Sequence, residues 1–256
     1  LRAPAWTRVP MPTSLDVHAL DAREPVDPSL DLEAEIARLK AERNAVILAH
    51  YYQDSEIQDL ADFVGDSLGL SQQAVKTDAD VILFCGVHFM AEVADIISRP
   101  EQVSILPDLS AGCAMADMAD LEQVQRAWRE LNSVLDADEC ITPVTYINSD
   151  ANLKAFCGEH GGIICTSTNA QNILEWSFGR REKVLFFPDQ HLGRNTAYKM
   201  GIALEEMVVW DYDLPMGGLS KEQIRNAKMI LWKVVCSVHQ MFKPEQIENF
   251  RREHPQ

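Results

Sequence analysis

Residues 45–85 read AVILAHYYQDSEIQDLADFVGDSLGLSQQAVKTDADVILFC, and their pattern decides the class of fold. Two short apolar runs, AVILA and DVILFC, enclose two segments with helical patterns, EIQDLADFV and SLGLSQQAVKT. Continuous apolar runs of this length are typical of strands that are buried on both faces. Strands of this kind that alternate with helices predict an α/β fold, with a parallel sheet between two layers of helices.

The alternation extends in both directions from this stretch. HFMAEVADIIS (88–98) predicts a helix, and VSILPDL (103–109) predicts a strand that leads to Cys113. Upstream, SLDLEAEIARLKAER (29–43) predicts a helix with Ser29 as its N-cap. Residues 1–30 contain five prolines and no sustained period, so we expect an irregular arm there.

The second half of the chain repeats the order of the first. Four pairs of segments correspond: 45–63 with 141–158, 64–75 with 164–174, 80–96 with 183–200, and 103–113 with 227–236. The second copy is longer, mainly through residues 210–226, which we expect to be a surface insertion rich in Pro and Gly. The sequence therefore predicts two α/β domains, 31–118 and 119–240, followed by a helix in residues 241–256.

Residues with chemical potential lie where the predicted strands end. In parallel sheets, ligands bind beyond the carboxyl ends of the strands. The side chains expected at such ends are His50, Ser67, Cys113, Tyr146, Ser167 and Cys236. Cys113 and Cys236 correspond in the two repeats, and a nearby helix N-terminus favours the thiolate, so both are candidate metal ligands.

Other readings of these residues stay open. His50 is either a hydrogen-bonded cap or an acid/base group, and Ser67 and Ser167 are either N-caps or anion ligands. We expect Asp189 and His191 to support the site. His239 is expected to lie on a helix surface or to support the site ligands, with metal ligation as the less favoured alternative. The roles of Cys85 and Cys165, which also end strands, are open, whereas Cys140 and Cys157 are expected to be packing residues.

Composition excludes several classes of protein. The net charge of −16 argues against binding to nucleic acid. No apolar run is long enough to cross a bilayer, and no secretory leader opens the sequence, so we expect a cytoplasmic protein with reduced thiols. None of the six cysteines forms a CxxC pair, and no His/Glu pair has the spacing of a zinc hydrolase.

Taken together, the motifs resemble the quinolinate synthase family, iron–sulfur enzymes of de novo NAD synthesis. The motifs that carry the resemblance are ILAHYYQDSEIQDLAD, GDSL, GVHFMAE, PDLSAGC, YINS, CTSTNA, FPDQHLG and ILWKVVCSVHQMF. The resemblance implies an enzyme that condenses iminosuccinate with dihydroxyacetone phosphate to quinolinate, phosphate and water. It also implies repeated Rossmann-like domains, of which the family has three around a pseudo-threefold axis, and a functional link to L-aspartate oxidase or aspartate dehydrogenase.

The resemblance also implies roles for individual residues. Cys113 and Cys236 match two of the three cysteine ligands of a [4Fe–4S] cluster whose open iron acts as a Lewis acid. His50 and Tyr52 match the catalytic pair. The matching positions for substrate binding are His50, Ser67, Tyr146, Ile147, Asn148 and Ser167.

The chain departs from the family pattern at its C-terminal end. It ends at FRREHPQ, where the third domain would supply the third cysteine and further substrate contacts. We therefore expect this chain to bind iron poorly and to make no quinolinate unless it is extended. The alternative is an inactive remnant or a dicarboxylate-binding protein without a stable cluster.

Overall fold

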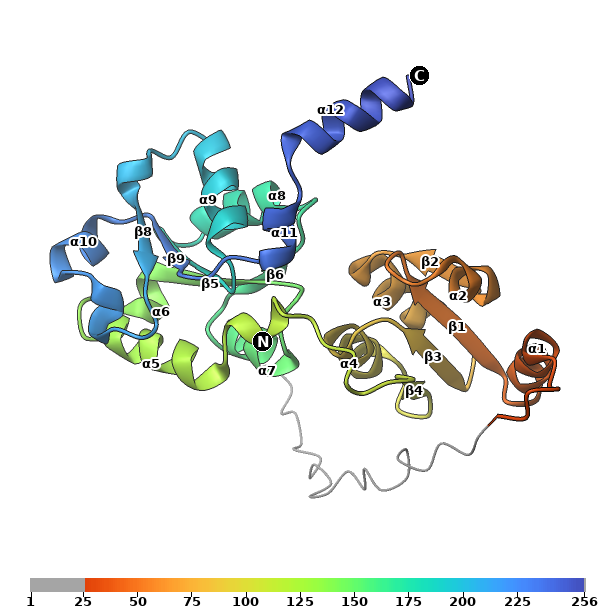
Figure 1. Cartoon of the computed structure of the whole chain (residues 1–256). Coiled ribbons are helices and arrows are strands. Elements are labelled where there is room, and N and C mark those ends of the chain that lie inside the picture. Colours follow the sequence, from red (N-terminus) through yellow and green to blue (C-terminus); the bar gives the residue numbers. More distant parts are fainter. Residues whose placement is uncertain (1–25, 256) are drawn as a thin grey trace.

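The computed structural model describes residues 26–255, which form two α/β units joined by a short segment (Figure 1). The irregular arm predicted for residues 1–30 lies mostly outside the described residues. The elements of the first unit are α1 (Leu32–Glu42), β1 (Ala45–His50), α2 (Ser55–Leu60), β2 (Phe63–Gly65), α3 (Ser67–Lys76), β3 (Val81–Cys85), α4 (His88–Ile97) and β4 (Val103–Ile105). A turn of 3₁₀ helix, η1 (Ala116–Met118), precedes the second unit.

The second unit contains more elements than the first. They are α5 (Leu121–Asn132), α6 (Ala137–Cys140), β5 (Ile141–Tyr146), α7 (Ala151–Glu159), β6 (Ile163–Cys165), α8 (Ala170–Phe178), β7 (Lys183–Phe187), α9 (Gln190–Lys199), η2 (Leu204–Glu206), β8 (Met207–Trp210), η3 (Pro215–Gly218), α10 (Lys221–Asn226), β9 (Met229–Trp232), α11 (Ser237–Met241) and α12 (Pro244–Glu253). Helix α12 extends away from this unit, and all its residues are exposed (Figure 1).

The two sheets have the same strand order. The first is β2-β1-β3-β4, and the second is β6-β5-β7-β9 with β8 added beyond β9. Every strand pair is parallel. The α/β class with parallel sheets is therefore confirmed, and the strand orders agree with the repeat read from the sequence. The predicted domain boundaries stay predictions, although Ala119 already belongs to a core cluster of the second unit.

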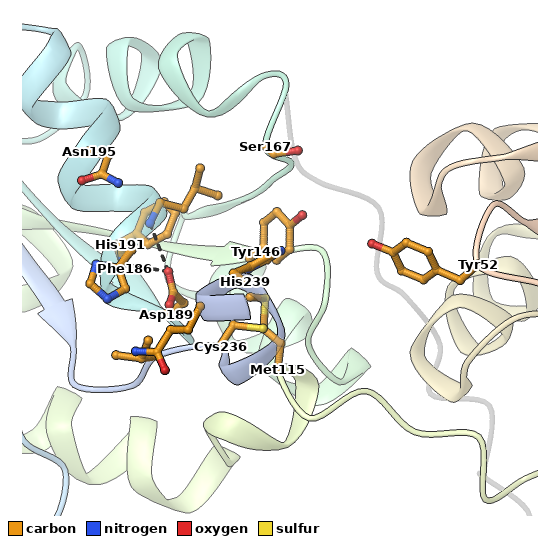
Figure 2. A pocket seen from close by; sticks show the side chains of 13 residues that line it. Tyr52, Met115, Tyr146, Ser167, Phe186, Asp189, His191, Asn195, Cys236 and His239 are labelled. Carbon is orange, nitrogen blue, oxygen red and sulfur yellow. Dashed lines mark hydrogen bonds between the residues drawn. The ribbon is translucent and has the colours of Figure 1, made fainter. Parts of the chain in front are cut away.

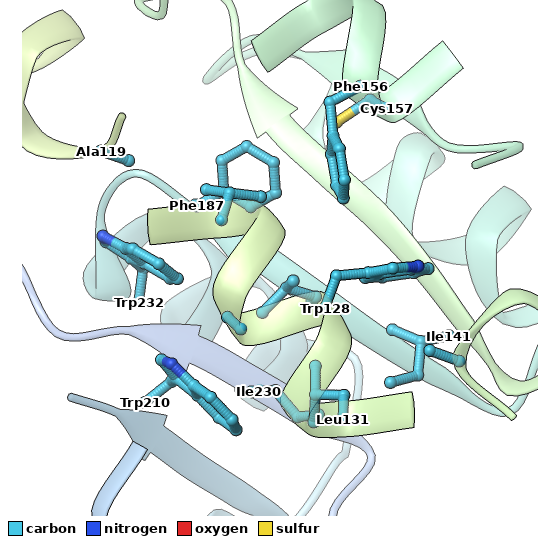
Figure 3. Close-up of a cluster of buried hydrophobic side chains, with 14 of the residues drawn as sticks. Ala119, Trp128, Leu131, Ile141, Phe156, Cys157, Phe187, Trp210, Ile230 and Trp232 are labelled. Carbon is cyan, nitrogen blue, oxygen red and sulfur yellow. The ribbon is translucent and has the colours of Figure 1, made fainter. Parts of the chain in front are cut away.

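Successive residues of the central strands pack on opposite faces of the second sheet. Leu185, Phe187, Ile230 and Trp232 join the cluster that α5 and α7 cover (Figure 3). Val184, Phe186, Met229 and Leu231 join the cluster that α8 and α9 cover. This alternation is the period of a strand, and it explains why β7 is apolar at almost every position.

Several local predictions were wrong. EIQDLADFV is not one helix, because α2 ends at Leu60 and β2 forms an edge strand at residues 63–65. The N-cap of α1 is Asp31, whose side chain accepts the N–H of Ala34, and not Ser29. The strand after α4 ends at Ile105, so Cys113 lies in a loop eight residues further on.

The segment 210–226 is not a simple surface insertion. Trp210 ends β8 and is 1% exposed, and Ile224 of α10 is fully buried beside it in the same core cluster. Gly217 has φ +62°, and a Cβ there would lie 2.4 Å from the Trp210 ring, so glycine is required. Residues 210–226 therefore cover part of the hydrophobic core of the second unit.

Candidate functional site

One cavity of about 480 Å³ lies at the carboxyl ends of the strands of the second unit and reaches the first unit (Figure 2). Its lining residues are Tyr52, Met115, Tyr146, Ser167, Phe186, Asp189, His191, Leu192, Asn195, Val235, Cys236, His239 and Gln240. Four of them were candidate ligands or catalytic residues from the sequence: Tyr52, Tyr146, Ser167 and Cys236. Asp189 and His191, which were expected to support the site, also line the cavity. Their convergence agrees with the rule that ligands bind where parallel strands end.

Tyr146 is the last residue of β5, and the hydroxyl of Tyr52 points toward it across the cavity (Figure 2). Burial raises the pKa of the Tyr146 hydroxyl, and a polar contact with Ser167 opposes this effect. The hydroxyl is therefore protonated at neutral pH and can donate a hydrogen bond into the cavity. Ser167 is exposed and lies three residues before α8.

His50 lies behind Tyr52 at the end of β1. Its ring centroid is 4.3 Å from that of Tyr52, and its Nδ1 accepts the backbone N–H of Tyr52 at 3.2 Å. The side chain of His50 is 6% exposed, and burial lowers its pKa, although the nearby Asp66 carboxylate opposes the shift. Because Nδ1 accepts a hydrogen bond, the neutral ring carries its proton on Nε2.

The histidine shift gives a prediction for stability. A histidine in an unfolded chain has a pKa of about 6.5, and the pKa of His50 is lower in the folded protein. The unfolded state therefore takes up the proton first, so the contribution of His50 to the free energy of unfolding should fall as the pH drops below 6.5 toward the folded-state pKa. Urea denaturation at several pH values should show that the free energy of unfolding decreases less between pH 8 and pH 5 for His50→Asn than for the wild type. The exposed His254→Asn variant is the control, and an equal decrease for all three proteins would contradict the assignment.

Ser67 and Ser167 are not N-caps, contrary to one reading of the sequence. Asp66 caps α3 by accepting the N–H of Gly69, and Ser67 is the first residue of that helix. Asn169 precedes α8, and its side chain accepts the N–H of Thr166. The hydroxyls of Ser67 and Ser167 are thus not needed to cap a helix.

The loop from Tyr146 to Asp150 belongs to the second unit and makes contacts with the first. The Nδ2 of Asn148 donates to the Sγ of Cys113 at 3.6 Å. The side chain of Ile147 is buried in the core cluster of the first unit, and its N–H donates to the carbonyl of Cys165. The substrate-binding roles of Ile147 and Asn148 stay predictions.

Of the two candidate metal ligands, Cys236 lines this cavity, whereas Cys113 lines a separate pocket beside α4. Cys236 is the N-cap residue of α11, is 6% exposed and lines the cavity. Cys113 is half-buried in the loop after β4, and Met115, two residues later, lines the cavity of Cys236. Cys113 is followed only by the single turn η1, so it does not precede a regular helix as the sequence suggested.

Two other cysteines at strand ends are poor ligands. Burial raises the pKa of Cys165 to about 12, and that thiol packs inside the core cluster under α8 and α9. Burial also raises the pKa of Cys85. Within residues 26–255, no group of three or more His, Cys, Asp or Glu residues is placed to hold a metal ion.

The wall formed by α9 and α11 was not predicted as a ligand surface. Asp189 caps α9 by accepting the N–H groups of His191 and Leu192 at 2.7 and 3.0 Å. Gly193 lets this helix approach the sheet, because a Cβ there would lie 2.7 Å from the ring of Phe186. The signal in the sequence was the i, i+4 spacing of His191 and Asn195, which puts both side chains on one helix face.

Comparison with known proteins identifies the family. The family model described as Quinolinate synthetase A protein matches residues 34–256. This chain belongs to that family. It is 51% identical to the quinolinate synthase of Rhodopirellula baltica over 255 residues, which cover 92% of this chain and 65% of the relative. It is 53% identical to that of Acidobacterium capsulatum, with 88% of this chain and 60% of the relative covered.

The match to the family is partial in length. A third relative, the quinolinate synthase of Bacillus subtilis, is 48% identical over 230 residues, which cover 88% of this chain and 61% of that protein. The chain thus spans less than two thirds of the length of these relatives. Among its described residues, no helix is long and apolar enough to span a membrane.

Proposed function

We propose that this chain provides two α/β units of a quinolinate synthase, which condenses iminosuccinate with dihydroxyacetone phosphate to quinolinate, phosphate and water in de novo NAD biosynthesis. The observation that carries the proposal is the single cavity lined by Tyr52 of the first unit and by Tyr146, Ser167 and Cys236 of the second. Family membership supports the same reaction.

Binding of substrate must rely on local donors. Iminosuccinate carries two carboxylates, and the chain has a net charge of −16, so long-range attraction does not favour it. The hydroxyls of Tyr146 and Ser167 can donate hydrogen bonds to a carboxylate in the cavity. We propose that Ser67 and Asn148 also donate to the substrate.

Proton transfer is assigned to the His50–Tyr52 pair. The ring of His50 is neutral at physiological pH because burial lowers its pKa, so it can accept or pass on a proton. Tyr52 is 82% exposed and reaches the cavity, whereas His50 is 6% exposed and lies in ring contact with Tyr52. We therefore propose that Tyr52 contacts the substrate directly and that His50 acts through its contact with Tyr52.

The proposed cofactor is a [4Fe–4S] cluster with Cys113 and Cys236 as two of its ligands. Such clusters are held by three or four thiolates. Residues 26–255 bring together no third ligand, so the donor set described here does not fit a complete cluster by itself. The role of the cluster as a Lewis acid stays a prediction from the resemblance, and the location in the cytoplasm stays a prediction from the composition.

Replacement of tyrosines tests the proposed site. In a protein extended to the length of the relatives, Tyr52→Phe should lower kcat for quinolinate formation by about 100-fold, the lower range for loss of a proton-transfer group. Tyr146→Phe, which loses a hydrogen bond to a substrate carboxylate, should lower kcat/KM by about tenfold. Tyr51→Phe is the matched control, since Tyr51 is the adjacent exposed tyrosine and is not among the lining residues. Turnover by both variants at the wild-type rate would refute the assignment.

The same assay separates the enzyme from the alternative function. If the extended protein binds a dicarboxylate in calorimetry but forms no quinolinate at any iron loading, the binding-protein reading replaces the enzyme. Because iminosuccinate is the oxidation product of L-aspartate, we also propose that the protein takes its substrate from L-aspartate oxidase or aspartate dehydrogenase. Coupled assays with either enzyme should then supply the substrate.

A further inference from the structure

Helix α4 of the first unit and helix α7 of the second are in contact (Figure 1). The N-cap of α7, Asp150, makes no side-chain capping bond of its own. Instead, Oε2 of Glu92, on α4, accepts the N–H of Ala151, the first residue of α7, at 2.8 Å. A carboxylate at this end of a helix is stabilised by the helix dipole, so the first unit supplies the cap of a helix in the second.

Lys154 strengthens the same contact from the other side. Its Nζ donates to the carbonyl of Ser149 at 2.5 Å and lies 5.2 Å from the ring centroid of Phe89, also on α4. Burial lowers the pKa of Lys154 to about 8, while the carboxylates of Glu92 and Asp150 oppose the shift, so the side chain is still charged at pH 7. The cation thus lies between the loop before α7 and an aromatic ring of the first unit.

These contacts act on the segments that carry the candidate site. The loop stabilised by Lys154 contains Tyr146, Ile147 and Asn148, and Asn148 donates to Cys113. The N-terminal end of α4 is also tied to the loop of Cys113, because the N–H of His88 donates to the carbonyl of Ala111 at 2.8 Å. Helix α4 is therefore linked to both segments that carry the Asn148–Cys113 hydrogen bond.

We propose that Glu92 and Lys154 are positioning residues: they fix the loop from Tyr146 to Asp150 against the loop of Cys113 and so set the width of the cavity between Tyr52 and Tyr146. Neither side chain lines that cavity among the described residues, so each acts through the loop and not on the substrate. The effect on catalysis rests on the proposed function, whereas the effect on the two loops does not.

Hydrogen–deuterium exchange measures the loops directly. In Glu92→Ala and Lys154→Met, amide exchange of segments 106–118 and 146–152 should rise about tenfold at pH 7, as expected for local opening. Glu92→Gln keeps an oxygen that can accept the N–H of Ala151, so its rise should be smaller. The controls are Asp95→Ala, an exposed carboxylate on α4, and Lys199→Met, an exposed lysine of the second unit.

A second readout separates positioning from general stability. Methionine keeps an apolar chain of similar length but removes the hydrogen bond to Ser149 and the contact of the cation with Phe89, so opening should be local and the melting temperature of Lys154→Met should fall by only a few degrees. In the extended enzyme, kcat should drop about tenfold for both Glu92→Ala and Lys154→Met, in line with a misplaced group near the substrate. If Glu92→Ala fails to fold, Glu92→Gln and Lys154→Met still decide the question.

The outcomes are distinct. Exchange in both loops that matches the controls would overturn the positioning role, whatever the activity. If the extended wild-type protein forms no quinolinate but the two loops open as expected, the proposed function fails and the positioning role stands.

Discussion

Anaerobic reconstitution of the 256-residue chain should give much less than one [4Fe–4S] cluster per chain and no quinolinate, whereas a chain extended to the length of its relatives should gain both. The described residues offer Cys113 and Cys236 but no third ligand beside them, and clusters of this kind need three or four thiolates. Cys165 cannot take the third place easily, because its buried thiol has a pKa of about 12.

The measurements are iron and sulfide counts after reconstitution, followed by a quinolinate assay. In the extended protein, Cys113→Ala and Cys236→Ala should each lose most of the iron. The matched control is Cys140→Ala on α6, which should load like the wild type because this thiol is not among the lining residues of the cavity. Full loading and turnover by the 256-residue chain would contradict the prediction and direct attention to Cys85 and Cys165.

Replacing Trp232 with alanine should lower the free energy of unfolding by about 3–5 kcal/mol, the usual cost of removing a large buried side chain. Trp232 ends β9 and is fully buried (Figure 3). Its ring stacks on Tyr212 with 5.5 Å between ring centroids. Its Nε1 donates to the carbonyl of Met118 at 3.2 Å, so the indole also ties the segment after Cys113 to the strand that leads to Cys236.

Urea denaturation followed by circular dichroism measures this effect. Trp232→Phe should lose less stability, because it keeps an aromatic ring and loses mainly the hydrogen bond to Met118. The control is Trp176→Ala, since Trp176 is 38% exposed and its main aromatic contact is with the Arg180 side chain. A loss for Trp232→Ala no larger than for Trp176→Ala would show that the core tolerates its removal.

The local sequence pattern predicted those strands whose signal lies within a few residues. The runs at 45–49 and 81–85 are strands of the first sheet and the repeated run at 183–187 is a strand of the second, as expected for short continuous apolar runs that alternate with helices. The edge strand β2 escaped this reading. It has only three residues, Phe63–Gly65, which are too few for a signal that separates them from the preceding helix.

The helix caps show a similar limit. Ser29 and Asp31 are both good N-caps, and local sequence does not rank them; the aspartate is used because α1 begins at Leu32. For α3, the choice of Asp66 over Ser67 follows from the place where the strand ends and the helix turns back onto the sheet. The burial of Trp210 was not predicted, because the Pro/Gly-rich residues that follow it are typical of a surface loop. Only the folded structure shows that this segment covers the core.

By itself, the sequence determined the class of fold, the repeat and the set of residues at the strand ends, because strand and helix periods are local properties and parallel strands end on one edge. Only the tertiary structure decided which of those residues share a cavity. Tyr52 reaches Tyr146, Ser167 and Cys236, while α9 and α11 complete the wall. That grouping depends on how the two units dock through α4 and α7. A contact between residues 59 positions apart, such as that of Glu92 with Ala151, leaves no periodic signal in the chain.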